Sequence, residues 1–243
     1  MSTTQPAPPA SEIVFYRAHG LGALIQRWEF EQTIHGFDEL SIVEIHKGLQ
    51  TDLSRWVETE KLRPYLTESE AALLAVPIGR WPTELVEDVG WRLESLGVMV
   101  WALGLIPTLP PYDRRCQHDD LLMHLRLGRP LRPQRADVRL RANAQLALAL
   151  ETAKLWEWRA QTAAILKQPD KIPAGVDMAG FVADRAATAR RQGLVGEPID
   201  GDLPALGRAY RALTDAEVTT LTAIAKLRAD TLRWLCGYTA APF

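Results

Sequence analysis

Cysteine is scarce in this sequence. Cys116 and Cys236 are the only two among 243 residues, and they lie far apart in the chain. Two distant cysteines do not form the disulfide framework that stabilises many small secreted domains. Apolar runs are also short: none approaches the roughly 18 residues that a membrane-spanning helix needs. Met1 is followed by a polar, proline-rich stretch, unlike a signal peptide. These features predict a cytoplasmic protein with no membrane segment.

Familiar catalytic motifs are missing as well. The sequence contains no glycine-rich phosphate loop, no His-Glu-x-x-His zinc motif and no Gly-x-Ser-x-Gly nucleophile motif. It therefore leaves the catalytic residues, if there are any, unknown, and it predicts no cofactor. Whether the protein is an enzyme stays open, with a non-enzymatic role favoured.

Net charge is small but unevenly distributed. With 24% charged residues and a net charge of −2, the composition is that of an ordinary globular protein, and it predicts no general binding of polyanions. The first 110 residues carry 15 acidic and 8 basic side chains, whereas residues 111–167 carry 6 acidic and 11 basic ones. This pattern predicts solvated faces of opposite sign, which meet within the fold or on a partner protein.

What the sequence does contain is helical periodicity. From Leu96 to Leu103 every position is apolar or glycine, which predicts a helix segment buried on all sides. Pro82 precedes this helix, and Gly104 and Pro107 follow it. The pattern predicts an all-α fold, an irregular multi-helix bundle around a buried central helix at about residues 84–103. One short strand near residues 13–16 is an alternative for a stretch too short for its periodicity to decide.

The expected organisation is a disordered arm at residues 1–10 and a single helical domain at 11–243, in which 11–64 could form an N-terminal subdomain. Two capping boxes, at Thr67–Glu70 and Thr214–Glu217, mark helix starts. Asp38–Leu62 is expected to form one helix, or two separated near Gly48. Further helices are expected at Cys116–Leu127, Val138–Leu166 (capped by Asp137) and Val176–Gln192, with a last one ending near Leu235.

The first candidate site is the polar end of the central helix, where Arg92 and Glu94 precede the apolar run. Buried charges must be paired, so a structural ion pair with another helix is the favoured interpretation, and Arg228 is a candidate partner. The alternative is a small-molecule enzyme whose polar interhelical pocket contains Arg92 and Glu94, because perturbed carboxylates cluster at functional sites.

The second candidate is a group of metal-competent side chains: Cys116, His118, Asp119, Asp120 and His124. The two histidines are six residues apart and do not share a helix face. Asp120 and His124 do share one, but they supply only two of the three or four ligands that zinc requires. The sequence therefore predicts no metal site.

The third candidate is a basic segment, expected to be a proline-broken loop that leads into a helix. Its arginines are Arg126, Arg129, Arg132, Arg135, Arg139 and Arg141. Guanidinium groups suit carboxylates and phosphates. Because no aromatic residues are interleaved to stack on bases, nucleic-acid binding is the weaker alternative. An acidic partner protein, or the acidic N-terminal half of the chain, is favoured, whereas the oligomeric state is not predicted.

Two stretches carry a family resemblance. Trp91-Arg92-Leu93-Glu94-Ser95, with the following Val100 to Ile106, resembles the central signature of the bacterial family known as domain of unknown function 4272. Leu213 to Glu217, followed by Arg228 and Trp234 to Tyr238, resembles its C-terminal signature. The resemblance covers roughly residues 65–239. It implies a shared helical fold and adds no catalytic residue, since the family has no assigned activity. An accessory role in a bacterial system fits it.

Overall fold

The computed structural model describes residues 7–36, 40–168, 170 and 172–240, and it confirms the all-α fold. The chain divides into two compact units. Of the described residues, we call those within 9–109 and 116–141 the N-terminal unit, and those within 110–115 and 142–240, together with residues 7 and 8, the C-terminal unit. Most of the expected arm, residues 1–6, lies outside the described residues, and Ala7–Ala10 belong to no helix or strand. No described helix combines the length and apolar character needed to cross a membrane.

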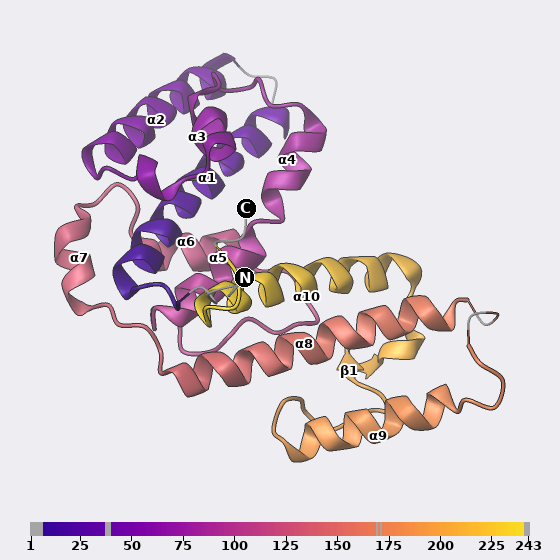
Figure 1. Ribbon diagram of the computed structural model, residues 1–243. Helices are drawn as coiled ribbons and strands as arrows, with labels where there is room; N and C mark the ends of the chain where they lie inside the picture. The colour runs from indigo at the N-terminus through magenta and orange to yellow at the C-terminus, as the bar shows by residue number, and fades with distance from the viewer. Residues whose placement is uncertain (1–6, 37–39, 169, 171, 241–243) are drawn as a thin grey trace, which may run out of the picture. The chain divides into compact units, whose positions relative to one another are not determined.

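The N-terminal unit is built around α1. Its elements are α1 (Ser11–Gly36), α2 (Leu40–Thr59), the 3-10 helix η1 (Arg63–Tyr65), α3 (Glu68–Ala75), α4 (Thr83–Gly90), α5 (Leu93–Ala102), α6 (His118–Leu125) and α7 (Leu131–Asp137). Helix α1 packs against α2, η1, α3, α4, α5 and α6, as Figure 1 shows for the indigo and magenta elements. Residues 11–64 therefore share their packing with later helices of this unit. The single domain at 11–243 stays a prediction.

The expected strand near residues 13–16 is wrong, because these residues form the start of α1. Val14, Phe15, Ala18 and Leu21 follow one another at helical spacing, and all are buried. The sequence pattern was ambiguous because α1 also buries charged residues among its apolar ones, including Arg17 and Arg27. A helix that is buried all round but carries charges has no clear periodicity of polar and apolar positions.

The predicted central helix at 84–103 is interrupted, and the structure has two helices there, α4 and α5. At the junction the amide of Arg92 donates to the carbonyl of Val89, and that of Glu94 to the carbonyl of Trp91. These bonds span three residues instead of four, so the chain makes a tight 3-10 turn. The predicted burial of Leu96–Leu103 is confirmed, and Leu93, Glu94 and Ser95 at the start of α5 are buried as well.

Gly90, at the end of α4, is a position where a side chain would press against a neighbouring ring. A Cβ there would lie 3.0–3.1 Å from the ring of Trp28, whose Nε1 donates to the carbonyl of Val86 at 2.6 Å and is thereby held in place. We expect Gly90→Ala to lower the free energy of unfolding by about 1–2 kcal/mol, although alanine is normally the better helix former. Thermal or urea unfolding measures the change.

Gly48, inside α2, is the matched control for this substitution. A Cβ at Gly48 would meet nothing within 4 Å, so Gly48→Ala should raise stability by up to about 1 kcal/mol. Equal effects of the two substitutions would show that the Trp28 contact has no energetic consequence.

The segment expected to be a proline-broken loop contains helix α7, which corrects that prediction. Arg126 adopts a left-handed conformation (φ 49°) and ends α6, and Gly128 turns the chain (φ 78°). Pro130 then precedes α7, and Pro133 lies within its first turn. The first amides of a helix have no intrahelical acceptor, so a proline in the first turn sacrifices no helical hydrogen bond. Prolines at these positions therefore permit the helix. The next helix starts at Asn143 instead of Val138, and Asp137 ends α7 rather than capping that helix.

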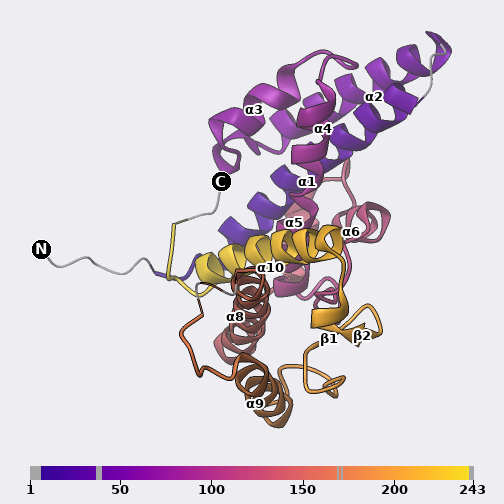
Figure 2. The same cartoon turned by 90° about the vertical axis from the view of Figure 1, so that its right-hand side faces the viewer.

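The C-terminal unit is a helical hairpin with additions. Its elements are α8 (Asn143–Leu166), α9 (Met178–Arg191), the short strands β1 (Pro204–Ala205) and β2 (Arg208–Ala209), the 3-10 helix η3 (Tyr210–Ala212) and α10 (Asp215–Leu235). Helices α8 and α10 form the main contact, and α9 packs on α8 (Figure 2). The strands pair antiparallel, Pro204 with Ala209 and Ala205 with Arg208. Both predicted capping boxes are confirmed.

Candidate functional site

Arg92 and Glu94 engage different partners, both within the N-terminal unit. Arg92 donates to Glu70 on α3 at 2.7 Å. Glu94 is fully buried and accepts from Cys116, from the amide at 3.0 Å and from Sγ at 3.4 Å. Glu94 therefore fixes the chain just before α6, which is a positioning role. The interhelical enzyme pocket stays a prediction.

Arg228 belongs to the C-terminal unit and is buried there on α10. It donates to the carbonyls of Pro110 (2.5 Å), Pro111 (2.9 Å) and Arg114 (3.2 Å), and its guanidinium lies 5.0 Å from the ring centre of Tyr112. These bonds tie residues 110–114 to α10. The suggested pairing of Arg228 with the polar end of the central helix stays a prediction.

Glu70 was not recognised from the sequence as the centre of a charge network. It is fully buried, and its carboxylate accepts from Arg17 (2.5 and 2.8 Å) as well as from Arg92. Burial works to raise the pKa of Glu70, but the hydrogen bond and charge of Arg17, the Thr67 amide and the charge of Arg92 together hold this pKa below its usual value. The capping box at Thr67 was the only sequence signal that pointed to this carboxylate.

The basic segment divides into arginines that are used within the unit and arginines that are not. Arg141 donates to the carbonyls of Trp101 and Ile106, and Arg135 pairs with Glu12. Arg139 donates to nearby carbonyls of its own segment. Three are exposed without an acceptor for their guanidinium groups among the described residues: Arg126, Arg129 and Arg132. Their charges are available to a ligand.

A groove in the N-terminal unit is lined in part by the turn between Arg126 and Arg129. It has a volume of about 500 Å³ and is lined by three segments. Helix α1 supplies Gln26, Glu29 and Phe30; α2 supplies His46, Leu49, Asp52, Leu53 and Trp56; the turn after α6 supplies Leu127 and Gly128. The indole Nε1 of Trp56 donates to the carbonyl of Arg129 at 2.9 Å and fastens this turn to α2. The groove therefore has an apolar floor and a fixed wall that connects Arg126 to Arg129.

Both carboxylates that line the groove already have partners. Asp52 pairs with Arg55 at 2.8 Å, and Glu29 accepts from Gln26 at 2.6 Å. The donor to Glu29 is a neutral amide, so of the two carboxylates only Asp52 is paired with a cation. In the described part of the chain, the cations next to the groove-lining turn that lack an acceptor are Arg126 and Arg129. The chemistry that fits is an apolar segment that carries negative charge.

A second hollow of the same unit, about 100 Å³ between α2 and α3, is a weaker candidate. Its one buried charge is Arg27, which pairs with Glu31 at 2.5 Å and donates to the carbonyl of Val76 at 3.2 Å. Burial lowers the pKa of Arg27, and its hydrogen bond to Glu31 works against this shift. Arg27 is used to hold the chain between α3 and α4.

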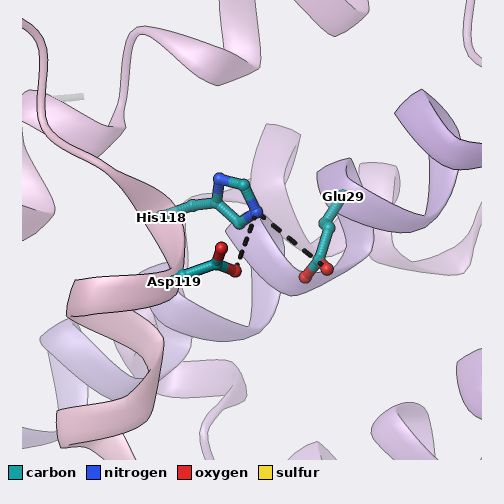
Figure 3. Close-up of side chains that lie close together, drawn as sticks. All are labelled: Glu29, His118 and Asp119. Carbon is teal, nitrogen blue, oxygen red and sulfur yellow. Dashed lines mark ion pairs between the residues drawn. The ribbon is translucent and has the colours of Figure 1, made fainter.

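The structure rearranges the metal-competent group that the sequence suggested. Cys116 bonds to Glu94, and His124 is exposed farther along α6. His118 and Asp119 instead approach Glu29 of α1 (Figure 3). His118 Nε2 lies 3.1 Å from Asp119 Oδ1 and 4.0 Å from Glu29 Oε1. One ligand atom from each residue lies within 4.8 Å of the other two. Sequence spacing had no means of finding Glu29, which comes 89 residues before His118.

Comparison with known families gives one match. The family model described as "Domain of unknown function (DUF4272)" matches residues 4–189. The range covers most of the chain and includes the signature at residues 91–106, whereas the stretch at 213–238 lies beyond it. No curated protein and no solved structure matches this chain. The family therefore supplies no activity, and the arguments for function come from the residues.

Proposed function

Because the chain belongs to the DUF4272 family, whose description assigns no activity, we propose from its own residues that it is a non-enzymatic protein-binding module. The observation that carries this proposal is the groove of the N-terminal unit, with its apolar floor and its neighbouring arginines. An accessory role in the bacterial cytoplasm fits it. The two cysteines, both among the described residues, are not joined in a disulfide, as is usual for cytoplasmic proteins.

The groove has the features of a site for an amphipathic helix. Leu49 stands at its edge with 42% of its surface exposed, above the buried Leu53 and Trp56. Ile45 of the same helix is 61% exposed, one turn before Leu49, and extends the apolar surface along α2. Adjacent exposed apolar side chains mark interaction sites more often than isolated ones do. A helix that binds such a groove inserts side chains spaced three and four residues apart.

The charges around the groove indicate whether the partner segment is acidic or basic. Since Arg126 and Arg129 lack acceptors in the described chain while Asp52 is already paired with Arg55, an acidic segment gains two ion pairs, whereas a basic segment gains one at most, with Glu29. We therefore assign to the groove an acidic amphipathic helix of a partner protein. This assignment also agrees with the excess of basic residues at 111–167.

Selection from a library of displayed peptides of about 15 residues, roughly four helical turns, tests the proposal without a known partner. We expect the recovered peptides to carry apolar residues three and four apart, interspersed with Asp and Glu. Leu49→Arg should weaken their binding at least tenfold because it places a charge on the apolar floor. The double variant Arg126→Glu/Arg129→Glu should weaken it similarly through repulsion.

Two matched substitutions control for nonspecific effects. Leu148→Arg changes a similarly exposed leucine on α8, and Arg80→Glu reverses an exposed arginine between α3 and α4. Both should leave peptide binding within about twofold. Recovery of basic peptides, or equal binding by the Leu49→Arg variant, would overturn the proposal. Salt-sensitive binding of a single-stranded oligonucleotide that depends on Arg126 and Arg129 would instead favour the nucleic-acid alternative.

A further inference from the structure

We propose that Glu29, His118 and Asp119 form a binding site for a divalent transition-metal ion. They supply one imidazole nitrogen and two carboxylate oxygens from two helices that the fold brings together (Figure 3). Imidazole favours Zn²⁺ and its first-row neighbours, whereas carboxylates alone would favour Mg²⁺ or Ca²⁺. Three protein ligands with a water molecule in the fourth position are a common arrangement for accessible zinc.

The distances agree with this chemistry. Ligands about 2.0–2.2 Å from a tetrahedral zinc ion lie about 3.3–3.6 Å from one another. The observed 3.1 Å between His118 and Asp119 is close to that range, and the 4.0 Å between His118 and Glu29 needs only a small side-chain shift. Glu29 and His118 are partly exposed and Asp119 is exposed, so an ion can reach all three. When the ion binds, His118 Nε2 donates its lone pair to the metal.

The surroundings hold the ligands in place, as a supporting shell does in metal sites. Gln26 donates to Glu29 Oε2 at 2.6 Å, which leaves Oε1 on the side of His118. The ring of His118 packs edge-on against Trp28 with centres 5.7 Å apart, and Trp28 is itself bonded to the carbonyl of Val86. These contacts are independent of the carboxylates and orient the imidazole toward Glu29.

Glu94 contributes from a distance. By accepting from both the amide and the thiol of Cys116, it fixes the chain two residues before His118. Glu94 is thus a positioning residue for the start of α6. Glu94, the buried carboxylate of the signature at residues 91–106, is thus connected to the proposed metal ligand His118 through its hydrogen bonds to Cys116.

The alternative is that Asp119 only stabilises the positive N-terminus of α6 and pairs with His118 in the metal-free protein. Asp120 lies in the same first turn of α6 but outside the three-residue group. It can therefore stabilise the helix N-terminus as Asp119 does, but a substitution of Asp120 should not affect metal binding. His124 serves the same purpose for His118, because it is an exposed histidine of the same helix.

Calorimetric titration of the chelator-treated full chain with Zn²⁺ tests the site. We expect saturable binding of one ion per chain, weakened at least tenfold by His118→Ala and by Glu29→Gln. His124→Ala and Asp120→Asn should change the affinity less than twofold. Circular dichroism checks that each variant is folded. Because Glu29 is partly exposed, we expect Glu29→Gln to leave the fold intact. The test therefore does not depend on His118→Ala alone.

Cobalt provides an independent readout. Co²⁺ at this site should give visible ligand-field absorption without the strong near-ultraviolet band of a cobalt–thiolate bond, because neither Cys116 nor Cys236 belongs to the group. Absence of saturable Zn²⁺ binding, a thiolate band, or equal losses in the His118 and His124 variants would overturn the proposal. The measurement uses no peptide, so it succeeds or fails independently of the protein-binding proposal.

Discussion

Asp202→Ala is expected to lower the free energy of unfolding by about 3–5 kcal/mol, because it leaves a buried guanidinium without its counter-charge. Asp202 and Arg159 are both about 1% exposed, and two bonds of 2.7 Å join them. The carboxylate also accepts from the backbone amides of Leu203 (2.7 Å) and Arg211 (2.9 Å). The side chain of Asp202 thus connects α8 to the segment around β1, β2 and η3. Its loss leaves four donors without their acceptor: two guanidinium nitrogens of Arg159 and two backbone amides.

Urea unfolding followed by tryptophan fluorescence measures this effect, and hydrogen exchange shows whether the loss is confined to the C-terminal unit. Glu151→Ala is the matched control, because Glu151 forms an exposed ion pair with Lys154 on the same helix. It should cost no more than about 0.5 kcal/mol. The double variant Arg159→Met/Asp202→Asn should recover part of the stability, since it removes both charges. Similar losses from Asp202→Ala and Glu151→Ala would contradict the assignment.

Glu70→Gln is expected to cost about 3 kcal/mol at neutral pH, since it removes the negative charge that both Arg17 and Arg92 face. Glutamine keeps one oxygen that can accept from the Thr67 amide, so the helix cap is largely preserved. The loss of stability therefore measures the effect of removing the charge of Glu70. Glu68→Gln is the matched control, because Glu68 is an exposed acid in the same first turn of α3. That substitution should change stability by less than about 0.5 kcal/mol.

The effect of Glu70→Gln should depend on pH. The pKa of Glu70 is lowered in the folded protein, so its stabilising contribution is present above the unfolded value of about 4.3 and is lost as pH falls through the lower folded value. The difference in unfolding midpoint between wild type and Glu70→Gln should therefore be largest at neutral pH and shrink in acid below about pH 4. A difference that stays constant from pH 7 to acid would show that ionisation of Glu70 is not the cause.

Local sequence patterns were sufficient wherever a structure depends on neighbours along the chain. The capping boxes at Thr67 and Thr214 are formed as predicted, because the residues that make them are three positions apart. The buried face of α8, with Leu146, Leu150 and Trp156, follows helical spacing in the same way. The all-α class was therefore predictable, and so was the burial of α5.

The same patterns failed where distant contacts decide the structure. The long central helix of the prediction is interrupted where Gly90 meets Trp28 and where Arg92 reaches Glu70 on another helix. Helix α1 lies at the centre of the N-terminal unit, although the charged residues that it buries interrupt its apolar pattern in the sequence. Those charges are tolerated because they are paired: Arg17 with Glu70, which is remote in sequence, and Arg27 with Glu31 of the same helix.

For the candidate sites the sequence determined which chemical groups are available, and the tertiary structure decided which of them meet. The basic segment and the metal-competent residues near His118 were visible as composition. Two features required the packing of α1 against α2 and α6: the third ligand Glu29 and the apolar groove beside Arg126 and Arg129. The physical reason is that a site needs groups within a few ångströms of one another. Periodicity reports which face of a helix is buried, but only the fold brings distant faces together.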